Sequence, residues 1–155
     1  MFMSIAGIPA HPLVIHLAAV AAPLAAALAI AWALQPGRFT RSWRITALIT
    51  SVVAAASMLA ARSTGESLLA PMGLSESNLG EVAQHAAYAN AATAAVVVLL
   101  GAVALFFIHS TGRFSIPAPG AIRGLMVVAA IATIISVVLV GHAGAQLAWA
   151  DLPGN

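Results

Sequence analysis

The stretch AHPLVIHLAAVAAPLAAALA, from Ala10 to Ala29, decides the fold, because it carries no charged residue along its whole length. It is close to the roughly 20 apolar residues that a helix needs to cross a bilayer. Two histidines, His11 and His16, stand at its start, and Pro23 lies in its second half. A histidine inside lipid is costly unless another group binds it. The stretch therefore predicts a transmembrane helix whose histidines meet a partner.

The composition of the whole chain indicates that a bilayer is its solvent. Of the 155 residues, 62% are hydrophobic and only 6% are charged, whereas about a quarter of an average soluble domain is charged. The chain has no cysteine, which excludes disulfides, iron–sulfur clusters and thiolate nucleophiles. Its basic residues are all arginines dispersed over short loops. This distribution is typical of membrane topology and not of a nucleic-acid interface.

Charged residues divide the chain into four apolar spans, which predict an all-α fold: an integral membrane, antiparallel four-helix bundle that forms a single domain over residues 1–155. The transmembrane helices are expected at about 12–34, 45–62, 85–108 and 123–150. The loops after the first and third spans hold most of the arginines, namely Arg38, Arg41, Arg44, Arg113 and Arg123. The other side holds Arg62 and all four acids. The positive-inside rule then predicts a multi-pass protein with both termini outside the cytoplasm, and with Trp32 and Trp43 at the inner interface.

A short internal repeat accompanies these spans. GRFT at Gly37 resembles GRFS at Gly112, and each follows an apolar span that opens with a histidine, His11 or His85. Each also precedes an arginine and a second apolar span. A duplicated helical hairpin would explain the match, and so would chance in a sequence of such low complexity. Both interpretations stay open at this point.

Several short motifs form a set. They are HPLVIH at His11–His16, TGE at Thr64–Glu66, the pair His85 and Asn90, and GHAGAQL at Gly141–Leu147. Together they resemble the bacterial four-helix membrane domain known as domain of unknown function 2231, over nearly the whole chain, although Leu17-Ala18 stands where that family has Phe-Pro. The resemblance implies the four-helix fold and the bacterial inner membrane. Some relatives are joined to Rieske-type domains, which implies a redox setting with a membrane or extracytoplasmic redox partner.

The predicted topology gathers four histidines in the outer half of the membrane. Two imidazoles on facing helices can hold a haem iron from both sides, and helix bundles commonly host such cofactors. We therefore predict a cofactor-binding membrane module, with b-type haem serving electron transfer. The predicted ligands are His16, His85 and His142, of which His16 and His142 are expected to lie deepest in the membrane.

Other residues are expected around these ligands, and other functions stay open. The predicted supporting residues are His11, Glu66, Asn90 and Gln146. Copper or zinc could take the same three histidines without a porphyrin. Alternatively, the chain is a non-catalytic membrane subunit or assembly factor that binds no cofactor and whose histidines are structural. No hydrolase or nucleotide-binding motif occurs, so no independent catalytic activity is expected, and the oligomeric state is open.

Overall fold

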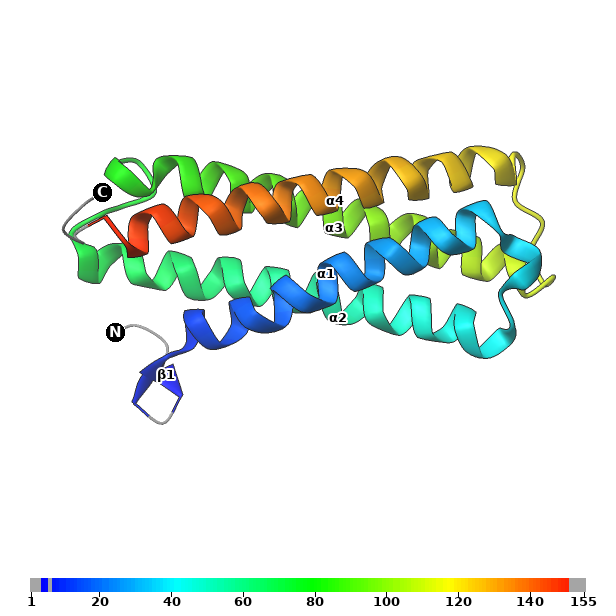
Figure 1. The fold of residues 1–155 in the computed structure, drawn as a ribbon, viewed down its shortest axis with the longest axis horizontal. Helices are drawn as coiled ribbons and strands as arrows, with labels where there is room; N and C mark the ends of the chain where they lie inside the picture. Colours follow the sequence, from blue (N-terminus) through cyan, green and yellow to red (C-terminus); the bar gives the residue numbers. More distant parts are fainter. Residues whose placement is uncertain (1–3, 6, 151–155) are drawn as a thin grey trace.

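The computed structural model describes residues 4–5 and 7–150, and over these residues the chain is all-α apart from one very short hairpin. The four long helices run up and down side by side (Figure 1). Each of them is long and apolar enough to cross a membrane. They are α1 (Ala10–Leu34), α2 (Arg41–Leu69), α3 (Ala83–Ser110) and α4 (Pro119–Ala148).

The helices extend beyond most ends of the predicted spans. α2 continues past Arg62 to Leu69, because Glu66 lies one turn after Arg62 and pairs with it at 2.8 Å. Charged residues at this spacing support a helix instead of ending it. α4 begins at Pro119, in the first turn, where proline is well tolerated because its missing N–H is not needed.

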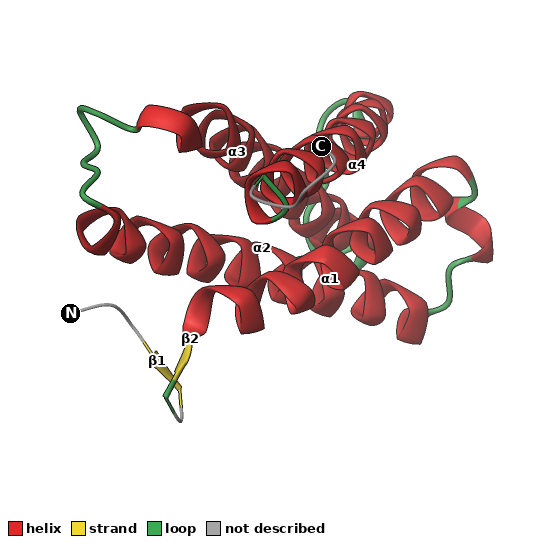
Figure 2. Ribbon diagram, turned by 60° about the vertical axis from the view of Figure 1, so that its left-hand side comes forward, coloured by secondary structure: helices red, strands yellow, loops and turns green. Residues whose placement is uncertain are grey.

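Short elements connect and precede the helices. The turn η1 (Pro36–Arg38) joins α1 to α2, whereas η2 (Ala70–Met72) and η3 (Gly80–Val82) belong to the longer connection between α2 and α3. Before α1, β1 (Ser4–Ile5) pairs antiparallel with β2 (Ile8–Pro9). Figure 2 shows this small hairpin as a projection from the start of α1, away from the other helices.

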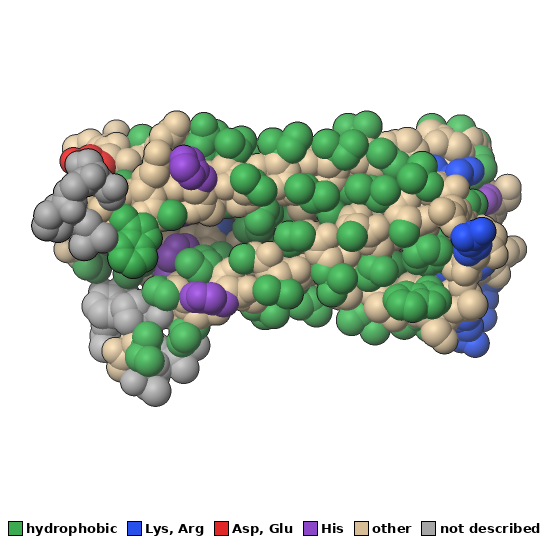
Figure 3. Space-filling view, viewed as in Figure 1, with side chains coloured by type: hydrophobic (Ala, Val, Ile, Leu, Met, Phe, Trp, Pro, Cys, Tyr) green, Lys and Arg blue, Asp and Glu red, His purple; other side chains and the backbone are tan. Residues whose placement is uncertain are grey.

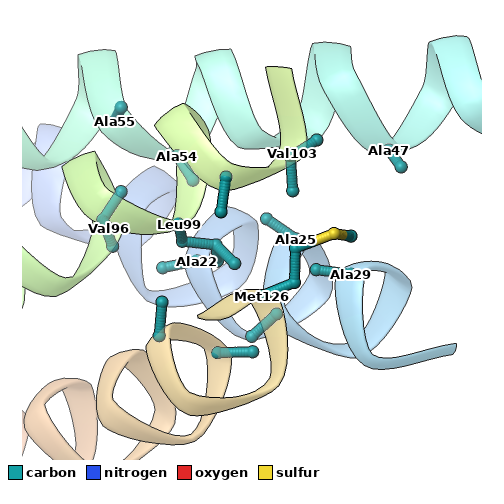
Figure 4. Packing of buried hydrophobic residues seen from close by; sticks show 14 of the residues in the cluster. Ala22, Ala25, Ala29, Ala47, Ala54, Ala55, Val96, Leu99, Val103 and Met126 are labelled. Atoms are coloured by element: carbon teal, nitrogen blue, oxygen red, sulfur yellow. The ribbon is translucent and has the colours of Figure 1, made fainter. Parts of the chain in front are cut away.

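The four helices form a closed ring in which α1 lies diagonally opposite α3, and α2 opposite α4. The core inside the ring consists mainly of alanine, with larger side chains chiefly on α3. Figure 4 shows Ala22 and Ala25 of α1 gathered with Leu99 of α3 and Met126 of α4. Small side chains allow membrane helices to approach closely, and close approach is the source of their van der Waals attraction.

Trp32 lies in this core, so its expected place at a membrane interface was wrong. Its side chain is only 1% exposed. The indole stacks on Phe39 with ring centres 5.9 Å apart and contacts Phe106 with ring centres 5.0 Å apart. A large aromatic side chain fills the space that alanine leaves at this end of the bundle. Trp43, in contrast, is exposed, as an interface position requires.

Large apolar side chains cover the outside of the bundle. Val20, Val128 and Val138 are each more exposed than buried, although all three lie in the middle parts of helices. Figure 3 shows apolar side chains along most of the length of one face. A soluble bundle places such residues on its inner face, whereas lipid is a good solvent for them. This distribution, together with the length of the helices, fits a multi-pass membrane protein.

The two hairpins, α1–α2 and α3–α4, carry equivalent residues at equivalent positions. Within each helix, the equivalent residues are separated by the same number of positions along the chain. They are His11 and Trp32 of α1 with His85 and Phe106 of α3, and Arg44 and Gly65 of α2 with Arg123 and Gly144 of α4. Both hairpins begin at the same end of the bundle, as parallel repeats do. A duplicated helical hairpin would make these positions equivalent, and the duplication stays a prediction.

Candidate functional site: a facing pair of histidines

Most of the histidines lie at the end of the bundle where α1 and α3 begin and α2 and α4 end, which we call the histidine end. His11, His16, His85 and His142 all occupy the first or last two turns of their helices there. Figure 3 shows histidine side chains gathered at this end and arginines at the opposite end. Among the described residues, His11 and His85 are the pair whose rings meet, with ring centres 6.5 Å apart and planes at 86°.

The backbone of α2 fixes the ring of His11. Its Nδ1 lies 2.9 Å from the carbonyl oxygen of Ala61 and 3.2 Å from the hydroxyl of Thr64. A carbonyl oxygen can only accept, so Nδ1 of the neutral ring carries the proton and donates it to Ala61. The Thr64 hydroxyl donates its own proton to the carbonyl of Ala60 at 2.8 Å. The lone pair of His11 is therefore on Nε2.

The backbone of α4 holds the ring of His85 in the same way. Nδ1 of His85 donates to the carbonyl oxygen of Val140 at 3.1 Å. Val140 occupies in α4 the position equivalent to that of Ala61 in α2. Neither Nε2 atom forms a hydrogen bond within the part of the chain that the structure describes. Both half-buried rings thus have the tautomer with which imidazole binds a metal through Nε2.

Two glycines make room for these rings. A Cβ atom on Gly65 of α2 would lie 3.1 Å from Cε1 of His11. A Cβ atom on Gly144 of α4 would lie 3.1 Å from Cε1 and 3.3 Å from Nδ1 of His85. Any larger residue would press each ring away from the carbonyl that holds it, because packed interiors have little slack. Gly141 differs, since a Cβ atom there would meet nothing within 4 Å.

The predicted ligands His16 and His142 lie apart from this pair. Both side chains are exposed on the surface of the bundle, and Nδ1 of His16 donates to the carbonyl of Pro12 in its own helix. Of the predicted set, only His85 belongs to the facing pair. Over residues 4–5 and 7–150, no three histidine or acidic side chains form a group that could hold a metal ion.

The four predicted supporting residues divide between the pair and the surface. His11 is itself a member of the pair. Arg62 donates to the amide oxygen of Asn90 at 2.9 Å and pairs with Glu66, which joins α2 to α3 on the exposed surface. Gln146 is exposed on α4. Asn90 therefore bonds a neighbouring helix, but within the described residues no hydrogen bond or ion pair connects Asn90, Glu66 or Gln146 to the imidazoles.

The signal that could have identified the pair was present in the sequence. His11 and His85 lie 74 positions apart, as do Trp32 and Phe106, whereas the residue 74 positions after His16 is Asn90. Depth in the membrane favoured His16 and His142, because a buried imidazole is costly, but depth does not determine which face of a helix a residue occupies. The repeat would have selected the two histidines that occur at equivalent positions.

Comparisons of the chain with protein-family models, with curated proteins and with solved structures gave no match. The resemblance to domain of unknown function 2231 stays a prediction. The function is therefore inferred from the contacts of the chain itself.

Proposed function

We propose that the chain is a membrane module that binds b-type haem for electron transfer, with His11 and His85 as the two protein ligands of the iron. One observation carries this proposal. Two imidazoles on diagonally opposite helices face each other, and a backbone carbonyl holds Nδ1 of each. This pair replaces the predicted set of His16, His85 and His142, because His16 and His142 are exposed.

The spacing of the pair supports a ligand bound between the two rings. Metal–imidazole bonds are about 2.0–2.1 Å long, so two imidazoles on opposite sides of one metal ion have ring centres roughly 6 Å apart. The ring centres of His11 and His85 are 6.5 Å apart. Each ring has a lone pair on Nε2 that is free to bind a metal, and Gly65 and Gly144 leave the space in which the two rings lie.

The number of ligands favours haem over copper or zinc. A bare zinc ion takes three or four ligands from the protein, and bound copper also takes several. The porphyrin of a haem supplies four nitrogens, so the protein needs to supply only two. Two imidazoles are what this site offers within the described residues.

Bound haem would supply one-electron transfer at the histidine end. The chain's own residues would hold the group: the carbonyls of Ala61 and Val140 fix the tautomer of each ligand and raise its basicity. We propose that the histidine end faces outward in the bacterial inner membrane, since the arginines gather at the other end. The electron partner would be a membrane or extracytoplasmic redox protein, and we propose no independent catalytic activity.

A structural role for the same histidines is the second candidate, and one observation favours it. The bond from His11 to Ala61 joins α1 to α2, and the bond from His85 to Val140 joins α3 to α4. Hydrogen bonds between membrane helices stabilise a bundle by about 1 kcal/mol each. The chain would then be a non-catalytic membrane subunit in which each histidine holds the two helices of its hairpin together.

Absorption spectroscopy separates the two candidates. The full chain is expressed in bacterial membranes with haem supplied, purified in a neutral detergent, and compared with four single variants. We expect a Soret band in the wild type, its loss in His11→Ala and in His85→Ala, and its retention in His16→Ala and His142→Ala. The last two are matched controls, because they remove exposed imidazoles from the same end of the bundle.

The melting temperature of each sample completes the test. A protein that binds no haem in a titration, yet melts at a lower temperature in His11→Ala and His85→Ala, would support the structural role and contradict haem binding. A Soret band that disappears equally in His142→Ala would contradict the choice of ligands.

A further inference from the structure

A pocket of about 350 Å³ opens at the arginine end of the bundle, which is the end opposite to the histidines. Its polar lining includes Arg44 of α2, Arg123 of α4 and His109 near the end of α3. Its apolar lining includes Trp32 and Phe106, which are buried and whose ring centres lie 5.0 Å apart. The pocket thus combines an aromatic floor with cationic walls.

Backbone carbonyls at helix ends hold the two guanidinium groups in place. Arg44 donates from Nε to the carbonyl of Phe39 at 2.9 Å, and from Nη1 to the carbonyl of Ser110 at 3.1 Å. Arg123 donates from Nε to the carbonyl of Ala33. Helix C-termini leave such carbonyls unpaired and attract cations. The arrangement is crossed, since each arginine binds the end of the first helix of the other hairpin.

No carboxylate in the described part of the chain neutralises these two arginines. The described acids Glu66, Glu76 and Glu81 lie in or next to the connection at the histidine end, and Asp151 lies outside the described residues. The ion pair that the structure shows joins Arg62 to Glu66.

The carbonyl bonds use only some of the five N–H donors on each guanidinium. Nη2 of Arg44 and both Nη atoms of Arg123 form no hydrogen bond to the described residues. Both side chains are half-buried, so water screens their positive charges less than at a free surface. Two cations that line one pocket with unused donors favour a shared anion, and planar guanidinium groups suit phosphate oxygens.

We propose that this pocket binds the phosphate group of an anionic phospholipid, with Arg44 and Arg123 as its donors. Three observations combine to favour a lipid over a soluble anion. The pocket lies at the end of helices that are long and apolar enough to cross a membrane, its floor is aromatic, and more arginines surround it at the same end. The proposed orientation puts this end on the cytoplasmic side, where basic pockets between transmembrane helices are typical sites for anionic head groups.

Native mass spectrometry of the full chain in a neutral detergent tests this assignment. The probes are dioleoyl phosphatidylglycerol, which is anionic, and dioleoyl phosphatidylcholine, which is zwitterionic. We expect the wild type to retain phosphatidylglycerol at least about tenfold more tightly than phosphatidylcholine, and Arg44→Gln or Arg123→Gln to lose about tenfold in that affinity. Arg38→Gln is the matched control, because Arg38 is an exposed arginine at the same end.

Ser110→Glu keeps the test decisive if an arginine variant does not fold. This change adds a carboxylate to the lining of the pocket without removing either guanidinium, so it should lower phosphatidylglycerol retention by about tenfold. Equal retention of the two lipids by the wild type would overturn the proposal, and so would an equal loss in Arg38→Gln. Inorganic phosphate that binds the lipid-free protein as tightly as phosphatidylglycerol binds would overturn the assignment to a lipid.

Discussion

The α1–α2 hairpin and the α3–α4 hairpin have the same contacts at their ends but fill the core between those ends differently. At the ends, a histidine of each hairpin bonds a backbone carbonyl, and an arginine of each bonds the end of the other hairpin. In the core, α1 contributes alanines where α3 contributes larger side chains. The equivalent buried positions are Ala22 and Val96, Ala25 and Leu99, and Ala29 and Val103.

This difference shows which features the fold holds constant. A core tolerates many apolar residues if its total volume is kept, so small side chains on α1 can compensate for large ones on α3. A ring that must meet a particular carbonyl, or a guanidinium that must reach a helix end, has no such freedom. The residues that stay the same in both hairpins are therefore those that we assign to binding sites.

Exchanging core residues between the hairpins tests the comparison, and we expect it to change the stability of the bundle the most. Leu99→Ala should lower the stability of the bundle by about 3 kcal/mol, because it leaves a cavity at a site that is 1% exposed. If the core depends on shared volume, adding Ala25→Leu should restore more than half of this loss. Thermal or denaturant unfolding in detergent gives both values, and a double variant less stable than Leu99→Ala alone would show that the two positions do not compensate.

The crossed arginine contacts give the next largest effect. Arg44→Gln and Arg123→Gln should each lower the free energy of unfolding by about 2 kcal/mol, since each removes a charged donor from a helix end. The two losses should be similar if the hairpins are equivalent. Arg41→Gln, an exposed arginine in the first turn of α2, should change stability by less than about 0.5 kcal/mol. A loss confined to one of the two arginines would break the equivalence.

The glycines beside the histidines should affect cofactor binding with little change in the rest of the bundle. Gly65→Ala and Gly144→Ala should each weaken haem binding by about tenfold, because the new Cβ atom would press on a ligand ring. Gly141→Ala should leave haem affinity unchanged and stabilise α4 by about 0.5–1 kcal/mol, since open space surrounds it. Haem titration followed by absorption measures the haem affinity of the three variants. Equal affinity in all three would contradict the inference that Gly65 and Gly144 make room for the ligand rings.

A substitution at Thr133 is expected to have the smallest effect on stability. Its buried hydroxyl has no hydrogen-bond partner among the described residues, whereas the equivalent position on α2 is Ala54. Thr133→Val should stabilise the bundle by about 1 kcal/mol, because it removes a buried polar group that lacks a partner. A loss of stability on this change would mean that the hydroxyl has a partner, such as a bound ligand.

The sequence was sufficient for the fold because the signal for transmembrane helices is strong. The apolar spans predicted all four helices, and the errors were confined to the helix ends. For example, α2 continues past its predicted end because Arg62 pairs with Glu66 one turn later. Trp32 was misplaced because an aromatic residue near a span end fits both an interface and a core.

Which faces of the helices meet was harder to predict than the helices themselves, for a physical reason. A helix that is apolar on all sides gives no periodic pattern, so its rotation about its own axis cannot be read from composition. His85 was predicted among the ligands and does lie in the facing pair, but its neighbour is His11 rather than His16 or His142. Among the features of the sequence, only the repeat indicated which faces of the first and third helices meet.

Chemical rescue tests the assignment of His11 and His85 as a ligand pair most directly. His11→Gly and His85→Gly each remove one ring beside a glycine of the adjacent helix, so free imidazole can enter the space that the ring occupied. We predict that both variants lose the Soret band of a haem with two imidazole ligands and regain it when imidazole is added, while His142→Gly never loses it. Variants that keep the wild-type spectrum without added imidazole, or a wild type that binds no haem, would contradict the account.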